Sequence, residues 1–128
     1  MFRNTLDYKD NPFKGETLEY RKSYAANLLS KFADRVPIII MRRSGDTIPL
    51  IKKQKYLVPR EYRMANIILI IRTGLQLDPG QAIFVFVNNV LVPNSQDVGS
   101  TYNDHKDNDG FLYITYCSES TFGTNTVI

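Results

Sequence analysis

The chain has one cysteine, one histidine and no long apolar segment. Cys117 has no second cysteine to pair with, so no internal disulfide can form and a reducing compartment such as the cytosol is expected. On a strand, such a lone thiol serves packing rather than nucleophilic attack. His105 has no accompanying serine or cysteine motif, which argues against catalysis. The longest aliphatic run, residues 67–71, is too short to span a bilayer, and we expect no signal peptide.

Length and charge indicate one domain with a bipolar surface. A chain of 128 residues can bury about two-thirds of its unfolded surface without a disulfide or a metal. The net charge is +3, but residues 1–72 hold fifteen Lys or Arg against seven Asp or Glu, whereas residues 73–128 hold one against six. This split predicts a basic side that faces acidic peptides, phosphate or membrane headgroups.

Two charged segments lack essential parts of a ligand site. The acidic run 107–110 is similar to the start of a calcium loop, but Tyr116 stands where the bidentate glutamate would have to be, so we expect no metal. Arg42, Arg43 and the lysines of residues 52–55 have no RNA-binding or helix-turn-helix pattern beside them. We therefore expect no nucleic-acid partner, and no cofactor.

The N-terminal quarter of the sequence predicts helix. Residues 1–15 contain turn signals and support only a short helix or an irregular arm. From residue 16 to residue 33, an apolar residue recurs at every fourth position, which predicts an amphipathic helix whose apolar stripe faces the core. The stripe consists of Tyr20, Tyr24, Leu28 and Phe32.

Two strands are predicted next. The apolar run 36–41 has the composition of a strand, and residues 44–46 predict a hairpin turn that returns the chain as a second strand over residues 47–53. Lysines at the end of this second strand are typical of an exposed sheet edge. We therefore expect residues 48–55 to form an edge at which an extended peptide can dock.

The second half alternates helix and strand. Residues 60–73 favour helix because the segment is long, with Pro59 as its N-terminal flank and Gly74 as its C-terminal cap. Residues 81–87 predict a strand, followed by a tight turn with positive φ at Asn88 and Asn89.

The end of the chain completes a recognisable order of elements. One short helix is expected within residues 94–110, and residues 111–116 predict the last strand. The resulting order is that of a ubiquitin-like β-grasp with two additional N-terminal helices, an α+β fold in which helix packs on a mixed sheet.

Six short motifs extend over most of the chain, from residue 8 to residue 123. They are Tyr8-Lys9, Pro12-Phe13, Asp34-Arg35-Val36-Pro37, Lys55-Tyr56-Leu57-Val58-Pro59, Val87-Asn88-Asn89 within the segment 84–93, and Phe111-Leu112-Tyr113-Ile114 continuing to Phe122-Gly123. In this order and spacing the chain resembles the autophagy ubiquitin-like modifiers of the GABARAP type.

The resemblance implies a modifier rather than an enzyme. In that family a cysteine protease cuts after the glycine that matches Gly123, which here would separate Phe122-Gly123 from Thr124 and release residues 124–128. The new carboxylate is activated with ATP, carried as a thioester by activating and conjugating enzymes, and joined to the amine of phosphatidylethanolamine. Two acyl chains would then fix the protein to the autophagosome membrane.

The resemblance also implies binding of peptides with an aromatic residue, two variable residues and then Leu, Ile or Val. Such a peptide would add a strand to the edge over residues 48–55. Alternate side chains of a strand share a face and lie about 7 Å apart, so two pockets would suffice. The family's aromatic pocket is matched by Tyr24, Leu28, Pro37, Ile39, Lys55, Leu57 and Phe111. Its aliphatic pocket is matched by Tyr56, Val58, Pro59, Tyr62, Ile67 and Ile70. Arg35, Lys53 and Lys55 would pair with acidic residues beside the motif.

The resemblance further predicts an N-terminal helical subdomain over residues 1–35, a β-grasp over residues 36–123 and a removable tail over residues 124–128. We expect a cytoplasmic monomer that is found on autophagosomes when lipidated. Tyr24 stands where the family usually has an acidic residue, and Gly74 where a basic one is common. The alternative from a different class is an adaptor that binds peptides but is never cleaved or lipidated.

Overall fold

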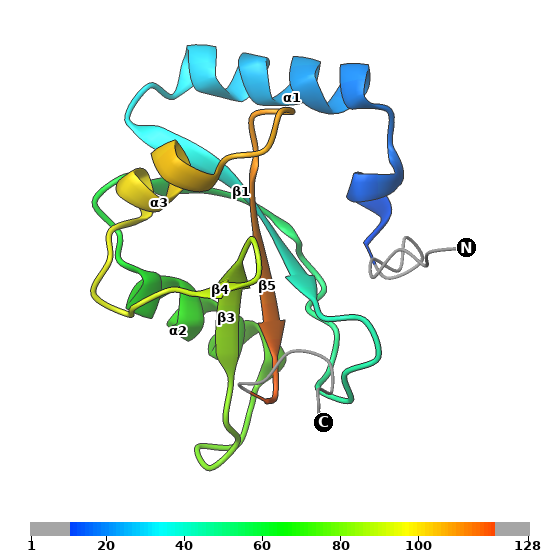
Figure 1. Ribbon diagram of the computed structural model, residues 1–128, viewed down its shortest axis with the longest axis vertical. Helices are drawn as coiled ribbons and strands as arrows, with labels where there is room; N and C mark the ends of the chain where they lie inside the picture. Colours follow the sequence, from blue (N-terminus) through cyan, green and yellow to red (C-terminus); the bar gives the residue numbers. More distant parts are fainter. Residues whose placement is uncertain (1–10, 120–128) are drawn as a thin grey trace.

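The computed structural model describes residues 11–119 and is built on a mixed sheet (Figure 1). The sheet has five strands in the order β2-β1-β5-β3-β4. β1 (Arg35–Arg42) pairs antiparallel with β2 (Lys55–Pro59) and parallel with β5 (Leu112–Cys117). On the other side of β5, β3 (Phe84–Val87) pairs antiparallel with it and forms a hairpin with β4 (Val90–Leu91). The predicted ubiquitin-like α+β fold is confirmed, with β2 and β4 as the two edges.

Within residues 11–119, four helical segments accompany the sheet. The 3₁₀ helix η1 (Pro12–Gly15) leads into α1 (Leu18–Lys31), and these are the two N-terminal helices that precede the β-grasp. α2 (Met64–Leu75) and α3 (Val98–His105) follow β2 and β4. Figure 1 shows α1 across the top of the view and α2 well below it.

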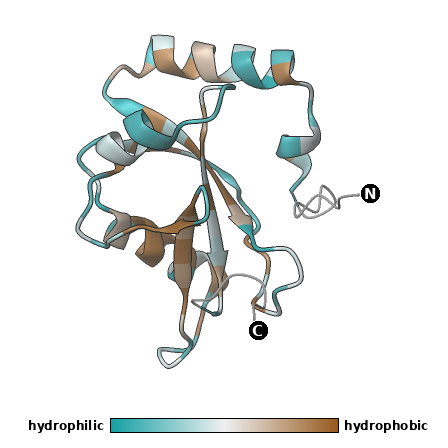
Figure 2. Cartoon of the chain, viewed as in Figure 1, coloured by the Kyte–Doolittle hydropathy of each residue, from teal (hydrophilic) through white to brown (hydrophobic). Residues whose placement is uncertain are grey.

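Side chains of β1 reach two separate clusters because strand neighbours point to opposite faces. Val36, Ile38 and Ile40 lie in the large core with α2, whereas Ile39 and Met41 lie in a smaller cluster with α1. A strand that is buried on both faces has to be apolar throughout, and Figure 2 shows brown along much of β1 and on α2.

The predicted second strand over residues 47–53 is wrong. β2 begins only at Lys55, so the edge lies over Lys55–Pro59 and not over residues 48–55. Ile48 and Ile51 turn into the core at 4% and 5% exposure. The Tyr116 hydroxyl accepts the Ile51 N–H and donates to the Pro49 carbonyl, so a side chain supplies bonds that a strand partner would have made. Pro49 in addition has no N–H for a ladder.

Left-handed backbone positions confirm one predicted turn and correct one predicted cap. Asn88 and Asn89 have φ of 51° and 64° in the β3–β4 turn. α2 does not end at Gly74, because the helix continues to Leu75 and the left-handed cap is Gln76 with φ 54°. Gly74 instead serves packing: a Cβ at Gly74 would lie 3.3 Å from the Ile51 side chain.

The apolar stripe of α1 faces the core only at its middle. Tyr24 and Leu28 pack against the small cluster, but Tyr20 and Phe32 are 49% and 41% exposed. A spacing of four residues exceeds the helical repeat of 3.6, so the two ends of the stripe rotate away from the sheet. The most buried residue of the helix is Ala25, at 1% exposure.

Candidate functional site

The open edge of β2 offers backbone groups to a ligand. The Ile40 N–H donates to the Gln54 carbonyl at 2.9 Å, which sets the phase of the antiparallel ladder. In that phase Lys55 and Leu57 direct their N–H and C=O groups away from β1. The outward Leu57 carbonyl accepts a hydrogen bond from Arg35 Nη1 at 3.4 Å. β2 can therefore accept a further strand along this edge.

Aromatic side chains gather on the α1 side of β2. The Phe111 ring centroid lies 4.9 Å from that of Phe13 and 6.0 Å from that of Tyr24. Leu28 and Ile39 belong to the same cluster, so four of the seven residues matched to the aromatic pocket are brought together. Phe111 and Ile39 are 0% and 1% exposed and form its floor. The remaining three, Pro37, Lys55 and Leu57, lie on the adjoining β1–β2 ladder.

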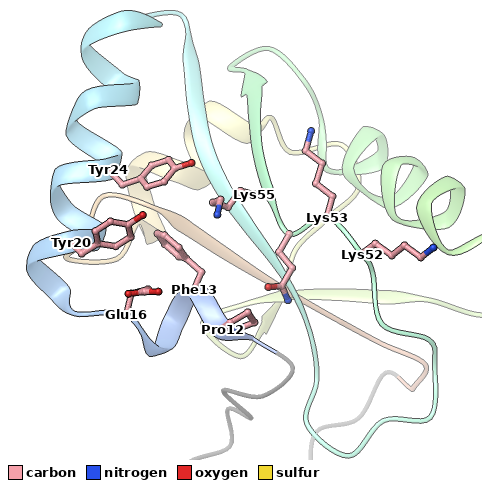
Figure 3. Close-up of a pocket in the computed structure, with 9 residues that line it drawn as sticks. Pro12, Phe13, Glu16, Tyr20, Tyr24, Lys52, Lys53 and Lys55 are labelled. Carbon is pink, nitrogen blue, oxygen red and sulfur yellow. The ribbon is translucent and has the colours of Figure 1, made fainter.

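A pocket of about 570 Å³ opens beside this cluster (Figure 3). Its lining consists of Pro12, Phe13, Glu16, Tyr20, Tyr24 and residues 52–55. One wall is thus the aromatic surface of η1 and α1, and the other is the lysine-rich approach to β2. The Lys55 Nζ lies 5.2 Å from the Phe13 centroid and 5.4 Å from the Tyr24 centroid, so a cation faces both rings.

Of the residues matched to the aliphatic pocket, four lie on the opposite side of β2, in or against the large core with α2: Tyr56, Val58, Ile67 and Ile70. Pro59 is in phase with Lys55 and Leu57 on the strand. Val58 and Ile67 are core residues at 4% and 0% exposure, so Ile67 does not line the surface in this structure. The matched residues that are partly or largely accessible are Tyr56, Pro59, Tyr62 and Ile70. Burial raises the pKa of Tyr56. The Lys53 Nζ lies 5.0 Å from its ring centroid.

The expectation that both pockets share a face of the strand is wrong. Lys55 of β2 faces the rings of Phe13 and Tyr24 on the α1 side, whereas Tyr56 and Val58 pack into the core on the α2 side. An aromatic residue and an aliphatic residue three positions later point to opposite faces of an extended peptide. The two groups therefore flank the edge in the way that this spacing requires.

A buried ion pair seats α1 on the sheet. The Arg21 Nη1 lies 2.6 Å from Asp109 Oδ2, and the Asp109 side chain is fully buried. The same oxygen accepts the Tyr113 hydroxyl, and Oδ1 accepts the Phe111 N–H at 2.8 Å. Burial and the bond to Asp109 raise the pKa of Tyr113. Because Tyr24 follows Arg21 by one helical turn and Phe111 follows Asp109, the ion pair fixes both the wall and the floor of the cluster.

A family model described as "Autophagy protein Atg8 ubiquitin like" matches residues 20–123. The chain belongs to the Atg8 family. The predicted resemblance is therefore confirmed, and the protein is an autophagy ubiquitin-like protein of the Atg8 type. Proteins of this family are ubiquitin-like modifiers rather than enzymes.

Individual Atg8 relatives cover nearly the whole chain. Autophagy-related protein 8D of Oryza sativa subsp. japonica is 46% identical over 117 residues, 90% of this chain and 99% of the rice protein. Autophagy-related protein 8e of Arabidopsis thaliana is 39% identical over 127 residues, 99% of this chain and 100% of the plant protein. The crystal structure of Trypanosoma brucei ATG8 superposes with a TM-score of 0.81 at 33% identity, over 94% of this chain and all of that one.

Several residues singled out in the sequence have a structural role or lie elsewhere in this Atg8 chain. Cys117 is fully buried, and burial raises the pKa of its thiol. His105 Nδ1 lies 3.3 Å from the Asn88 amide nitrogen at the β3–β4 turn. The predicted processing residues, Phe122, Gly123 and Thr124, lie outside the described residues. Within residues 11–119, no group of three or more metal-binding side chains occurs, and no helix is long and apolar enough to cross a bilayer.

Phe13 and Tyr20 line the pocket although the resemblance did not assign them to it. Phe13 is only 6% exposed, and its ring lies 5.8 Å from Tyr24. In the sequence it belongs to the Pro12-Phe13 motif, in an arm that also holds Phe2 and Tyr8, and no periodic pattern assigns it to a pocket. Tyr20 was visible only as a member of the helical stripe, and the outward rotation of the stripe brings it to the rim of the pocket.

Proposed function

We propose that this Atg8 chain is a modifier that is cut after Gly123 by a cysteine protease, joined by activating and conjugating enzymes to phosphatidylethanolamine, and used on autophagosome membranes to recruit peptide-bearing partners. The match to the family model ends at Gly123 and leaves residues 124–128 outside it, which supports this position for the cut. The division into residues 1–35, 36–123 and 124–128 remains part of the proposal.

The observation that carries the recruiting activity is the open β2 edge between two apolar surfaces. An extended peptide would add backbone hydrogen bonds at Lys55 and Leu57. Its aromatic side chain would enter the pocket lined by Phe13 and Tyr24, and its aliphatic side chain three positions later would meet the α2 side near Tyr56. The peptide would be anchored on both faces of one strand, which fixes its register.

Intact mass measured on soluble and membrane fractions of starved cells tests the modifier activity. We expect a soluble chain ending at Gly123 and a membrane form heavier by one phosphatidylethanolamine. A chain that still ends at Ile128 in both fractions would refute cleavage and lipidation. The structural case for peptide binding would then favour the adaptor that is never lipidated.

Leu57→Ala should weaken binding of an aromatic-x-x-aliphatic peptide by about 1 to 3 kcal/mol, because a half-buried apolar side chain at the middle of the edge is lost. Titration calorimetry measures the effect. Leu91→Ala on the opposite edge, where Leu91 is 51% exposed, is the matched control and should leave the affinity unchanged. Equal affinities for both variants would remove Leu57 from the site.

Raising the salt concentration should slow association with a peptide whose motif is flanked by Asp or Glu. The lysines beside the pocket attract such a peptide from a distance, and at about 0.1 M salt this attraction is screened beyond about 10 Å. Stopped-flow association rates measure the slope. Replacing Lys53 and Lys55 by Met should flatten it, whereas Lys31→Met at the far end of α1 should not. A wild-type rate that does not depend on salt would contradict steering by these lysines.

A further inference from the structure

The loop between β1 and β2, residues 43–54, is fastened to Tyr116 near the end of β5 and to Ser118 just after it. At one end the Tyr116 hydroxyl bonds the backbone of Pro49 and Ile51, at 2.7 and 2.8 Å. At the other end stands Asp46, whose side chain is 1% exposed. The loop thereby covers the point at which the chain leaves the sheet toward the C-terminus.

Asp46 accepts hydrogen bonds from its own loop and from Ser118, which is 72 residues away. Its Oδ1 accepts the Ile48 N–H at 2.9 Å. Its Oδ2 accepts the Ser118 N–H at 3.0 Å and the Ser118 hydroxyl at 3.2 Å, and Arg43 Nη2 lies 3.5 Å away. Burial alone would raise the pKa of Asp46, but these hydrogen bonds and Arg43 lower it, so the carboxylate is charged at neutral pH.

The carboxylate replaces the next rung of the β1–β5 ladder. The Arg43 N–H donates to the Tyr116 carbonyl at 2.9 Å, and in a parallel ladder the following bond would run from the Ser118 N–H to the Arg43 carbonyl. That carbonyl instead accepts the Asp46 N–H at 3.1 Å, and the Ser118 N–H goes to the Asp46 side chain. Asp46 therefore stops the ladder and holds Ser118 in place.

We propose that Asp46 is a positioning residue for the reactions at Gly123, because it fixes the point from which the reactive C-terminal segment starts. This inference rests on the proposed function. Gly123 follows Ser118 by only five residues in the sequence. An enzyme that receives this segment has to order fewer residues than if the end of β5 were released.

Cleavage kinetics of the full chain with the processing cysteine protease of its source organism test the proposal. Asp46→Ala should raise KM about tenfold, which corresponds to the cost of ordering about one more residue. The value of kcat should stay unchanged, because the bonds between Asp46 and Ser118 act before the protease binds and do not touch the scissile bond. Asp104→Ala, which removes an exposed carboxylate on α3, is the control and should match the wild type. Amide hydrogen exchange should show lost protection at Ser118 and retained protection at Ile114.

Two milder variants keep the test valid if Asp46→Ala does not fold. Asp46→Asn retains a carbonyl oxygen for the Ser118 N–H, and Ser118→Ala removes only the hydroxyl contact, so each should raise KM less, by about two- to threefold. An unchanged KM in all three variants that fold would overturn the role of Asp46. A wild-type chain that is not cut after Gly123 would instead refute the proposed function, and the positioning role with it. Unchanged peptide binding at β2 would show that the effect is confined to the C-terminal segment.

Discussion

Asp109→Ala should lower the free energy of unfolding by about 3 to 5 kcal/mol, the cost of breaking a buried ion pair by removing one partner. The Arg21 guanidinium, with a side chain only 11% exposed, would lose its counterion. The Tyr113 hydroxyl and the Phe111 N–H would lose their acceptors in the same place. Equilibrium unfolding in urea measures the loss.

A second effect separates this ion pair from an ordinary stabilising contact. Because Arg21 holds α1 and Asp109 holds the start of β5, the loss should also loosen the aromatic pocket and weaken peptide binding. Asp104→Ala is the matched control, and its unfolding free energy should stay within about 0.5 kcal/mol of the wild type. A loss for Asp109→Ala as small as that of the control would show that Arg21 finds water or another acceptor.

The sequence identified elements where local and tertiary preferences agree. Residues 36–41 are apolar without interruption, and a strand buried between two helical layers needs that composition. Asn88 and Asn89 are residues that tolerate positive φ, and the β3–β4 turn uses both in that conformation. In these places the local sequence alone is sufficient to predict the local structure.

The second strand was misplaced because tertiary contacts override the local pattern between Arg43 and Lys55. Ser44-Gly45-Asp46 has the composition of a hairpin turn, but Asp46 bonds to Ser118, which is 72 residues away. Ile48 and Ile51 are three residues apart and do not follow the two-residue alternation of a strand. Both side chains enter the core from a loop. No window of local sequence contains the β5 residues that make these contacts.

The candidate site was predicted by residue type better than by geometry. Tyr24, Leu28, Ile39 and Phe111 do form one cluster, but Phe13 had no periodic pattern to reveal its place in it. The Arg21–Asp109 pair joins residues 88 positions apart, and either residue alone reads as an ordinary surface charge. Such a pair becomes visible only when α1 has been placed over β5.

Gly123→Ala should leave folding and peptide binding intact and reduce lipid attachment by at least about 100-fold. A methyl group beside the reacting carbonyl obstructs the narrow enzyme clefts that a glycine can enter, and small misplacements of a reacting group cost about this much. Gly80→Ala is the matched control, because a Cβ at Gly80 meets nothing within 4 Å. Membrane fractionation followed by intact-mass measurement should find the lipid-linked form in the wild type and in Gly80→Ala only. If Gly123→Ala gains the mass of phosphatidylethanolamine as readily as the wild type, the acyl carbon belongs to another residue, and the chemistry does not depend on an unhindered glycine.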